Sequence, residues 1–308
     1  MTAFLHLEDV YKSYGSKRVL DNVDLAVGQG ELCAVVGPSG CGKSTLLRQI
    51  LGEERPDSGQ ILLDGKEVGT PDPSRGIVFQ RYSLFPHLTV IGNVMLGREL
   101  ANGPWQRWHL RKQFREEAMH FLERMRLAEH ADKYPHELSG GMQQRVAIAQ
   151  SLLLKPRILM MDEPFGALDP ETREQMQMFL LELWDAEKMT VFFVTHDLEE
   201  AIYLGTRVLV LSQFYRDDRG DGPNVNRGAK VVCDLQLPRT VLSTDVKASP
   251  EFKQLVQQTR HEGFDPTYRR HVSEFNLKHP NSFRTLTAEE LHTTANPAPV
   301  AAPSTPPG

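Results

Sequence analysis

The sequence predicts an α/β protein with a mostly parallel sheet, an antiparallel β subdomain at its start and an inserted α-helical subdomain. Apolar and polar residues alternate through the first thirty residues, with turn signals at Gly15 and at residues 28–30, which is typical of short antiparallel strands. Further along, the strand-like runs RILMMD, TVFFVT and RVLVLS are separated by helical stretches. This alternation of strand and helix indicates a parallel sheet.

The other elements follow from local composition. The apolar run 32–36 (LCAVV) predicts a buried strand, and KSTLLRQIL, after a glycine-rich turn, predicts a helix. RPDSGQILLDG predicts a turn and a short strand. From about residue 88 to 154 the pattern becomes helical, which predicts the inserted subdomain. Near the end, AKVVCDLQLP predicts one more strand and EFKQLVQQTR a short helix.

Length and composition fit a folded protein with a sizeable core. Of the 308 residues, 40% are hydrophobic and 24% are charged, which excludes wholesale disorder and fibrous structure. The formal net charge is −5, so there is no overall basic field that would attract nucleic acid. Cys33, Cys41 and Cys233 lie far apart, which excludes a disulfide framework and suits a reducing compartment.

The sequence predicts neither secretion nor a membrane span. The opening MTAFLHLEDVYKSYG has acidic residues where a signal peptide would carry its apolar core. No apolar run approaches the roughly 18–20 residues that a membrane-spanning helix needs. If the protein serves a membrane, we expect it to do so through a partner.

The strongest functional signal is the glycine-rich loop between the strand at 32–36 and the helix after it. It fits the pattern G-x-x-x-x-G-K-[ST] and comprises Gly37, Pro38, Ser39, Gly40, Cys41, Gly42, Lys43, Ser44 and Thr45. Such glycines let backbone N–H groups turn inward around a polyphosphate, and the helix N-terminus adds its dipole. Lys43 can reach the β- and γ-phosphates and the Ser44 hydroxyl can ligate Mg²⁺. A merely flexible turn is disfavoured, and the context predicts a P-loop NTPase core that binds ATP and Mg²⁺.

A second signal is an apolar strand that ends in two acids, Asp162 and Glu163. It places both carboxylates at the carboxyl end of the sheet, where α/β proteins bind ligands. We expect Asp162 to hold the Mg²⁺ shell, and Glu163 to orient the attacking water or take its proton. An isolated Asp-Glu pair would be a solvated strand end, but the phosphate loop favours the functional interpretation.

A third signal is LSGGMQQR at 138–145, where Ser139, Gly140 and Gly141 open a predicted helix. Free N–H groups and a small hydroxyl at a helix start form an anion site. In isolation the serine would be an ordinary N-cap. Here the motif precedes the Asp162-Glu163 strand by about twenty residues, and the whole set resembles the ATP-binding cassette (ABC) family. In that family, LSGGQ-type residues complete the nucleotide site of the opposite subunit.

The resemblance covers about residues 4–237 and implies roles for four further residues. Gln80 matches the glutamine loop, which couples the γ-phosphate and metal to the membrane partner. Asp169 matches the D-loop, which in that family lies between the two subunits. His196 matches the switch histidine, which contacts the γ-phosphate and positions the attack, and Tyr14 sits where the family places an aromatic ring against adenine. The resemblance therefore implies catalysis by Glu163, His196 and Gln80, and a Mg²⁺ shell from Ser44, Gln80 and Asp162.

The implied mechanism is an electrostatic clamp between two copies of the chain. Each of two Mg·ATP sites would be built from the phosphate loop of one copy and Ser139 and Gly141 of the other. Contacts to the γ-phosphate from both sides favour the closed dimer, and hydrolysis removes them.

Among ABC proteins, the sequence favours a bacterial-type importer. Chromosome-type members carry a long coiled coil between the two motifs, whereas Lys43 and Ser139 lie fewer than a hundred residues apart. Ribosome-type members carry two cassettes. A non-transport ABC ATPase acting on nucleic acid or ribosomes stays the alternative, and a P-loop kinase would have no use for LSGGMQQR. The importer reading implies permease subunits, an indirect solute-binding protein, a second ATPase copy, no nucleic acid, and a peripheral location on the cytoplasmic side of the inner membrane.

The cassette resembles the nitrate, sulfonate and taurine importer ATPases, on DEPFGALDPETREQMQMFLLELW and MTVFFVTHDLEEAIYLGTRVLVLS. The segment FQRYSLFPHLTVIGNVMLG is also similar to members associated with urea or guanidine carboxylation. Both resemblances imply uptake of a small solute that contains nitrogen or sulfur.

Three regions are expected along the chain. Residues 1–237 form the ABC ATP-binding domain, 238–283 form a partly helical extension, and 284–308 form a disordered tail rich in Pro, Ala and Thr. The insertion at 213–228 is expected to lengthen a hairpin. The basic aromatic stretch 104–115 is interpreted as a solvated helix start with packed tryptophans; a face toward a permease or anionic lipid, or toward nucleic acid, is the alternative.

Overall fold

The computed structural model describes residues 4–79, 84–220, 225–237 and 244–283. Its strands are β1 (Leu5–Tyr14), β2 (Lys17–Val27), β3 (Leu32–Val36), β4 (Ser58–Leu63), β5 (Lys66–Glu67), β6 (Arg75–Val78), β7 (Ile158–Asp162), β8 (Thr190–Val194), β9 (Arg207–Ser212), β10 (Tyr215–Arg216), β11 (Lys230–Gln236), β12 (Arg270–His271) and β13 (Asn276–Leu277). Its α-helices are α1 (Lys43–Leu51), α2 (Val90–Ala101), α3 (Pro104–Arg124), α4 (Gly140–Leu152), α5 (Pro170–Glu187), α6 (Leu198–Leu204) and α7 (Pro250–Phe264), and short 3₁₀ helices cover Ala128–His130, Pro135–Glu137, Thr244–Ala248 and Val272–Glu274.

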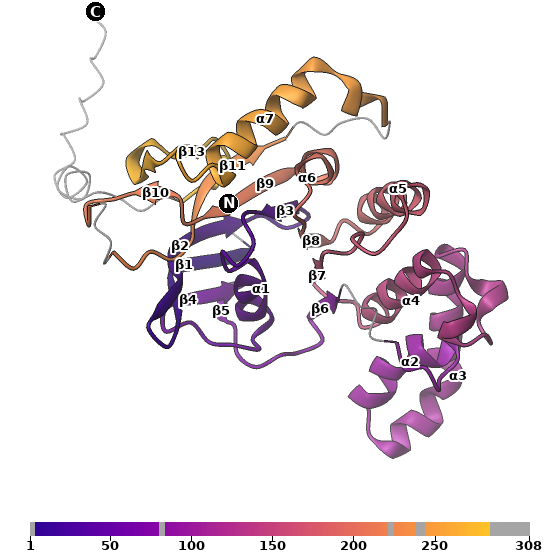
Figure 1. The fold of residues 1–308 in the computed structure, drawn as a ribbon. Helices are drawn as coiled ribbons and strands as arrows, with labels where there is room; N and C mark the ends of the chain where they lie inside the picture. Colours follow the sequence, from indigo (N-terminus) through magenta and orange to yellow (C-terminus); the bar gives the residue numbers. More distant parts are fainter. Residues whose placement is uncertain (1–3, 80–83, 221–224, 238–243, 284–308) are drawn as a thin grey trace, which may run out of the picture.

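The predicted α/β class is confirmed, with one large mixed sheet, one small antiparallel sheet and a two-stranded parallel pair, β10 and β12. The large sheet has the strand order β13-β11-β9-β3-β8-β7-β6. Its central pairs are parallel, and β11 runs antiparallel to β9. The small sheet has the order β2-β1-β4-β5 and antiparallel pairing. In Figure 1 the small sheet and α1 lie on one side of the large sheet's strands, and α2, α3 and α4 gather beyond β6 and β7.

The large sheet is buried on both faces, and the alternation along β3 shows how. Leu32, Ala34 and Val36 belong to the core shared with the helices from α2 to α7. Cys33 and Val35 point to the opposite face, into the core shared with the small sheet and α1. Because successive side chains of a strand point to opposite faces, an all-apolar strand of this kind must lie in the middle of a sandwich of layers.

The start of α3, in the helical subdomain, carries exposed aromatic side chains. The prediction that its tryptophans pack is wrong, because Trp105 and Trp108 are each 74% exposed. Leu100, near the end of α2, is 71% exposed. The inward face of α3 is formed instead by Phe114, Ala118 and Leu122. The exposed aromatic surface is of the kind that marks interaction sites in other proteins. None of the described helices is long and apolar enough to cross a bilayer.

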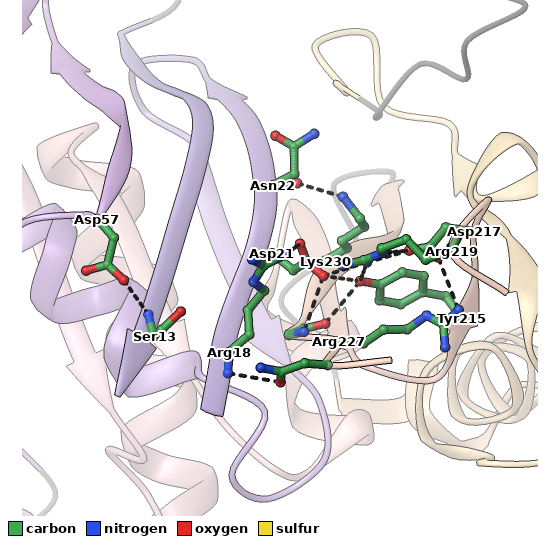
Figure 2. Close-up of polar contacts among 12 residues, drawn as sticks. Ser13, Arg18, Asp21, Asn22, Asp57, Tyr215, Asp217, Arg219, Arg227 and Lys230 are labelled. Carbon is green, nitrogen blue, oxygen red and sulfur yellow. Dashed lines mark hydrogen bonds and ion pairs between the residues drawn. The ribbon is translucent and has the colours of Figure 1, made fainter. Parts of the chain in front are cut away.

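The predicted hairpin is confirmed, since β9 and β11, which the segment at 213–228 joins, pair antiparallel. The described residues of this segment, 213–220 and 225–228, also fold back onto β2. Figure 2 shows the Asp21 carboxylate at the centre of the contact. Asp21 Oδ2 accepts hydrogen bonds from the Tyr215 hydroxyl at 3.0 Å and from Arg219 Nη2 at 2.6 Å. Asn226 Oδ1 accepts from the backbone N–H of Arg18 at 3.2 Å, and so ties the hairpin to the start of β2.

The extension after β11 closes over a buried ion pair. Arg207 is fully buried and forms a bidentate pair with Asp234, with Nε–Oδ1 and Nη2–Oδ2 distances of 2.8 and 2.6 Å. The carbonyl of Asp234 accepts backbone hydrogen bonds from Lys278 and His279. Ser282 Oγ donates to the carboxylate of the same aspartate. The segment around β13 therefore seals the pair from solvent.

Most expected elements are present, and the differences are short edge strands. The helix expected at 251–260 is covered by α7, which contacts β9, β11 and α6 and lies over these elements in Figure 1. The pairs formed by β6, β12 and β13 were not predicted. Each of these strands has only two to four residues, and its extended conformation depends on pairing with a neighbouring strand rather than on its own sequence pattern. The predicted tail at 284–308 lies outside the described residues.

Candidate functional site

The phosphate loop joins β3 to α1 through a turn that requires glycine at both ends. Gly37 has a φ of 155° and Gly42 a φ of 106°. A Cβ at Gly37 would lie 2.1 Å from the carbonyl oxygen of Leu211, and one at Gly42 would lie 2.8 Å from Cγ1 of Val19. The strands β9 and β2 therefore hold the loop so closely that a side chain has no room at either position.

Between these two glycines the loop has an open position at Gly40, and the ammonium group of Lys43 lies inside the turn. Lys43 Nζ donates to the carbonyls of Gly37 at 2.7 Å and Pro38 at 3.0 Å, so its ammonium lies inside the turn. Gly40 has a φ of 74° and open space where a Cβ would be. Cys41 is buried, and burial raises the pKa of its thiol, so its side chain is a neutral packing group.

Ser44 and Asp162 form an oxygen pair beside the loop. Ser44 Oγ donates to Asp162 Oδ2 at 3.3 Å, although the two residues are 118 positions apart. Asp162 ends β7, and burial raises the pKa of its carboxyl. A hydroxyl and a carboxylate fit Mg²⁺, which takes oxygen ligands and fills its octahedron with water and phosphate. Gln80, the third predicted ligand, lies outside the described residues.

Glu163 and His196 meet at the carboxyl ends of the neighbouring strands β7 and β8. His196 Nδ1 lies 3.3 Å from Glu163 Oε1. Glu163 has a φ of 47°, a left-handed conformation that is uncommon for glutamate. Its backbone N–H donates to the carbonyl of Val194 at 2.9 Å, which fixes the turn after β7. This strained backbone aims the carboxylate at the histidine, and strain of this type gathers at functional sites.

Tyr14 ends β1 and is 46% exposed. Its hydroxyl hydrogen-bonds to Glu54, and Lys12 Nζ lies 5.7 Å from the ring centroid. An exposed aromatic face held at its hydroxyl end is suited to stack on a planar base.

The predicted second anion site is at the start of α4. Ser139 is the N-cap, and its Oγ accepts from the N–H of Met142 at 3.4 Å. A Cβ at Gly141 would lie 2.5 Å from Cγ2 of Thr172 on α5. Asp169 caps α5 by accepting from the N–H of Thr172 at 3.0 Å, so the α4 start and Asp169 share one neighbour. Figure 1 places α4 well apart from α1, on the far side of β6 and β7.

The structure thus brings the predicted residues together in two groups. Ser44 lies with Asp162, and Glu163 with His196, at the carboxyl edge of the sheet. Gly141 and Asp169 form the second group. Sequence reasoning missed the buried side chains behind His196, above all Glu200, whose carboxylate accepts from the Thr195 hydroxyl. The signal was a glutamate on the apolar face of a short helix, where an acid needs a partner.

Comparisons with known proteins identify a matching family and similar chains. The family model described as ABC transporter matches residues 20–166. The chain is 39% identical to the nitrate import ATP-binding protein NrtD of Synechococcus elongatus over 274 residues, which cover 87% of this chain and 93% of that protein. It is 40% identical to the bicarbonate transport ATP-binding protein CmpD of a Synechocystis strain over 242 residues, covering 77% and 82%.

Among solved structures, the chain is similar to the dimeric ATP-binding cassette MJ0796 bound to ADP and Pi. The TM-score is 0.59 at 31% identity, and the match covers 77% of this chain and 100% of that one. The range matched by the family model contains the phosphate loop, the start of α4 and the acidic end of β7.

Proposed function

This chain belongs to the family of ABC transporter ATP-binding proteins and is an ATPase, and we propose that it powers the import of a small solute that contains nitrogen or sulfur. The single observation that carries the hydrolytic site is the convergence of the Ser44–Asp162 pair and the Glu163–His196 pair at one edge of the sheet, next to the phosphate loop. In α/β proteins this edge is where ligands bind.

In the proposed reaction, the chain's own groups position the γ-phosphate and a water molecule. The loop N–H groups and Lys43 hold the phosphates, and Tyr14 stacks on adenine. Ser44 and Asp162 would hold Mg²⁺, which supplies positive charge to the transferring phosphoryl group. Glu163 accepts a hydrogen bond from the attacking water and takes its proton. His196 contacts the γ-phosphate and keeps the Glu163 carboxylate in place from 3.3 Å.

We propose that two copies of the chain form two such sites. The start of α4 lies away from the phosphate loop of its own chain, which leaves the exposed Ser139 available to the γ-phosphate held by a second copy. Gly141, the other residue expected at this site, is buried against Thr172 of α5. The dimeric state of the MJ0796 relative supports this arrangement. Gln80 would then couple the nucleotide to a permease, and Asp169 would lie between the subunits.

The proposed partners and location follow from the proposed role in import. We propose integral membrane permease subunits as the direct partners, and an extracytoplasmic solute-binding protein as an indirect one. The chain would then lie on the cytoplasmic side of the inner membrane as a peripheral subunit. The nitrate-import relative supports a nitrogen-containing solute such as nitrate, while sulfonate, taurine and urea or guanidine rest on the resembling segments alone.

The test is a pull-down of tagged Glu163→Gln protein from detergent-solubilised native cells in the presence of Mg·ATP. Recovery of a multi-span membrane protein, identified by mass, supports the importer. Its binding protein is then screened against nitrate, taurine, urea and guanidine. Recovery of ribosomes or DNA-associated proteins without a permease would overturn the transport role and favour the non-transport alternative.

A further inference from the structure

A chain of hydrogen bonds, partly buried at Lys247 and buried beyond it, connects the C-terminal extension to the loop that carries His196. It starts at Lys247, whose Nζ donates to Gln177 Oε1 at 3.2 Å. Gln177 Nε2 donates to Glu200 Oε1 at 2.9 Å. The other carboxylate oxygen of Glu200 accepts from the hydroxyl of Thr195, the residue before His196. We infer that Glu200 is a positioning residue for His196. We infer also that Lys247, by fixing the Gln177 amide, sets the orientation of the Glu200 carboxylate. This inference rests on the proposed role of His196.

The direction of every bond in this chain is determined by chemistry. An ammonium can only donate and an ionised carboxylate can only accept. Gln177 must therefore turn its oxygen to Lys247 and its NH₂ to Glu200. The Thr195 hydroxyl donates to Glu200 and accepts from the N–H of Asp197 at 3.1 Å. Neither the amide nor the hydroxyl has an equivalent second orientation.

Burial makes this arrangement costly to change. Thr195, Gln177 and Glu200 are 3%, 3% and 6% exposed. A buried polar group left without a partner destabilises the folded state, and a charged one does so more strongly. The side chains therefore stay paired, and this pairing fixes the backbone of the loop that carries Thr195 and His196.

The loop is held on both sides of the histidine. Before it, the N–H of Thr195 donates to the carbonyl of Val35 on β3 at 3.2 Å. After it, Asp197 caps α6 by accepting from the N–H of Glu199 at 2.9 Å and of Glu200 at 3.2 Å. His196 itself is bonded to Glu163 only through its ring nitrogen at 3.3 Å, so the position of its ring depends on these neighbours.

Lys247 brings the extension into this arrangement. Its Nζ also lies 4.3 Å from the centroid of the Tyr203 ring on α6, a distance at which the cation is attracted by the ring face. Lys247 precedes α7, which packs on α6. The extension thus supplies the charge that decides which way the Gln177 amide points.

The test measures kcat and KM for ATP in purified full-length variants, under conditions in which the urea-unfolding curve of each variant shows it to be fully folded. Thr195→Val should lower kcat by about tenfold to a hundredfold, since a misplaced catalytic group costs on this scale. The KM for ATP should change less than about twofold, because the phosphate loop and Tyr14 are not touched. Thr195→Ser keeps the hydroxyl and should restore kcat. A wild-type kcat in Thr195→Val would overturn the inference.

A double variant isolates the role of Lys247. In Glu200→Gln alone, the new amide must turn its oxygen to the NH₂ of Gln177, which Lys247 prevents from turning. Its own NH₂ then faces Thr195, and the Thr195 hydroxyl loses its acceptor. Adding Lys247→Met frees Gln177 to turn its oxygen toward the new amide, so the double variant should have a higher kcat than Glu200→Gln alone. Lys253→Met, a change on the exposed side of α7, is the matched control and should give no rescue. Equal rescue by both lysine variants, or by neither, would refute the part given to Lys247.

His196→Ala separates this inference from the proposed function. If His196→Ala hydrolyses ATP like the wild type, the proposed role of the histidine is wrong and the inference fails with it. If His196→Ala is inactive while Thr195→Val is fully active, the role of His196 stands and only the inference is wrong.

Discussion

His196 Nδ1 lies 3.3 Å from Glu163 Oε1, although the two residues are 33 positions apart. Each follows one of two adjacent parallel strands, β7 and β8, whose carboxyl ends meet at the same edge of the sheet. The left-handed backbone of Glu163 turns its side chain toward this edge. The contact supports the proposed roles of the carboxylate as the base for the attacking water and of the imidazole at the γ-phosphate.

Glu163→Gln should bind ATP with near wild-type affinity and hydrolyse it at least about a hundredfold more slowly, because the amide cannot take a proton. Closed dimers should accumulate with Mg·ATP. Phosphate release and size-exclusion chromatography measure the two effects. Wild-type turnover would show that another group is the base.

Lys43→Ala should weaken ATP binding by tenfold or more, since it removes the ammonium that lies inside the phosphate loop. Isothermal titration with ATP measures the affinity. Lys66→Ala, on the exposed strand β5, is the control for loss of one positive charge. Equal affinities in the two variants would contradict the assignment of the loop.

Arg207→Met should destabilise the fold by about 3–5 kcal/mol, because it leaves the carboxylate of Asp234 buried without its cationic partner. Arg207→Met combined with Asp234→Asn should recover part of this loss, since the uncompensated charge is gone. Urea unfolding measures both free energies. A double variant less stable than the single one would show that the aspartate has another stabilising partner of equal weight.

Stability should rise with pH between about 8 and 10 because of Lys230. Burial lowers the pKa of this lysine to about 8, whereas a lysine in an unfolded chain titrates near ~10.4. In this window the unfolded state binds more protons than the folded state, so the free energy of unfolding increases with pH. Below pH 8 the cost of the buried charge, on the order of 3 kcal/mol, is fully present.

The matched variant is Lys230→Met, which has no charge to bury. Its free energy of unfolding should exceed that of the wild type at pH 7.5, and the difference should shrink by pH 9.5. Guanidinium unfolding at the two pH values measures it. Parallel pH profiles for the two proteins would place the pKa of Lys230 near its ordinary value.

Deletion of residues 293–308 should leave ATP hydrolysis unchanged, because a segment composed largely of Pro, Ala and Thr cannot bury a core. The measurement is kcat with and without the segment. A large change in kcat would point to a regulatory role for the end of the chain, which lies outside the described residues.

Local sequence determined the elements that carry the site. The loop 37–45 is contiguous with its strand and its helix, so one motif specifies the turn, the lysine and the helix start together. The strands β7, β8 and β9 are apolar runs of five or six residues whose burial on both faces follows from their composition. The convergence of their carboxyl ends follows from parallel pairing, which strand–helix alternation indicates.

Tertiary structure alone decided which distant side chains meet. The exposure of Trp105 and Trp108 depends on which face of α3 finds the core, and the pairing of Arg207 with Asp234 depends on the register of β9 and β11. The same holds for Lys247 and Gln177, 70 positions apart, because a hydrogen bond of this kind leaves no periodic trace in the sequence. The sequence by itself thus determined the ATPase and its local elements through patterns of neighbouring residues. Packing decided how the extension is joined to the loop of His196, because that contact exists only once α5, α6 and α7 lie together.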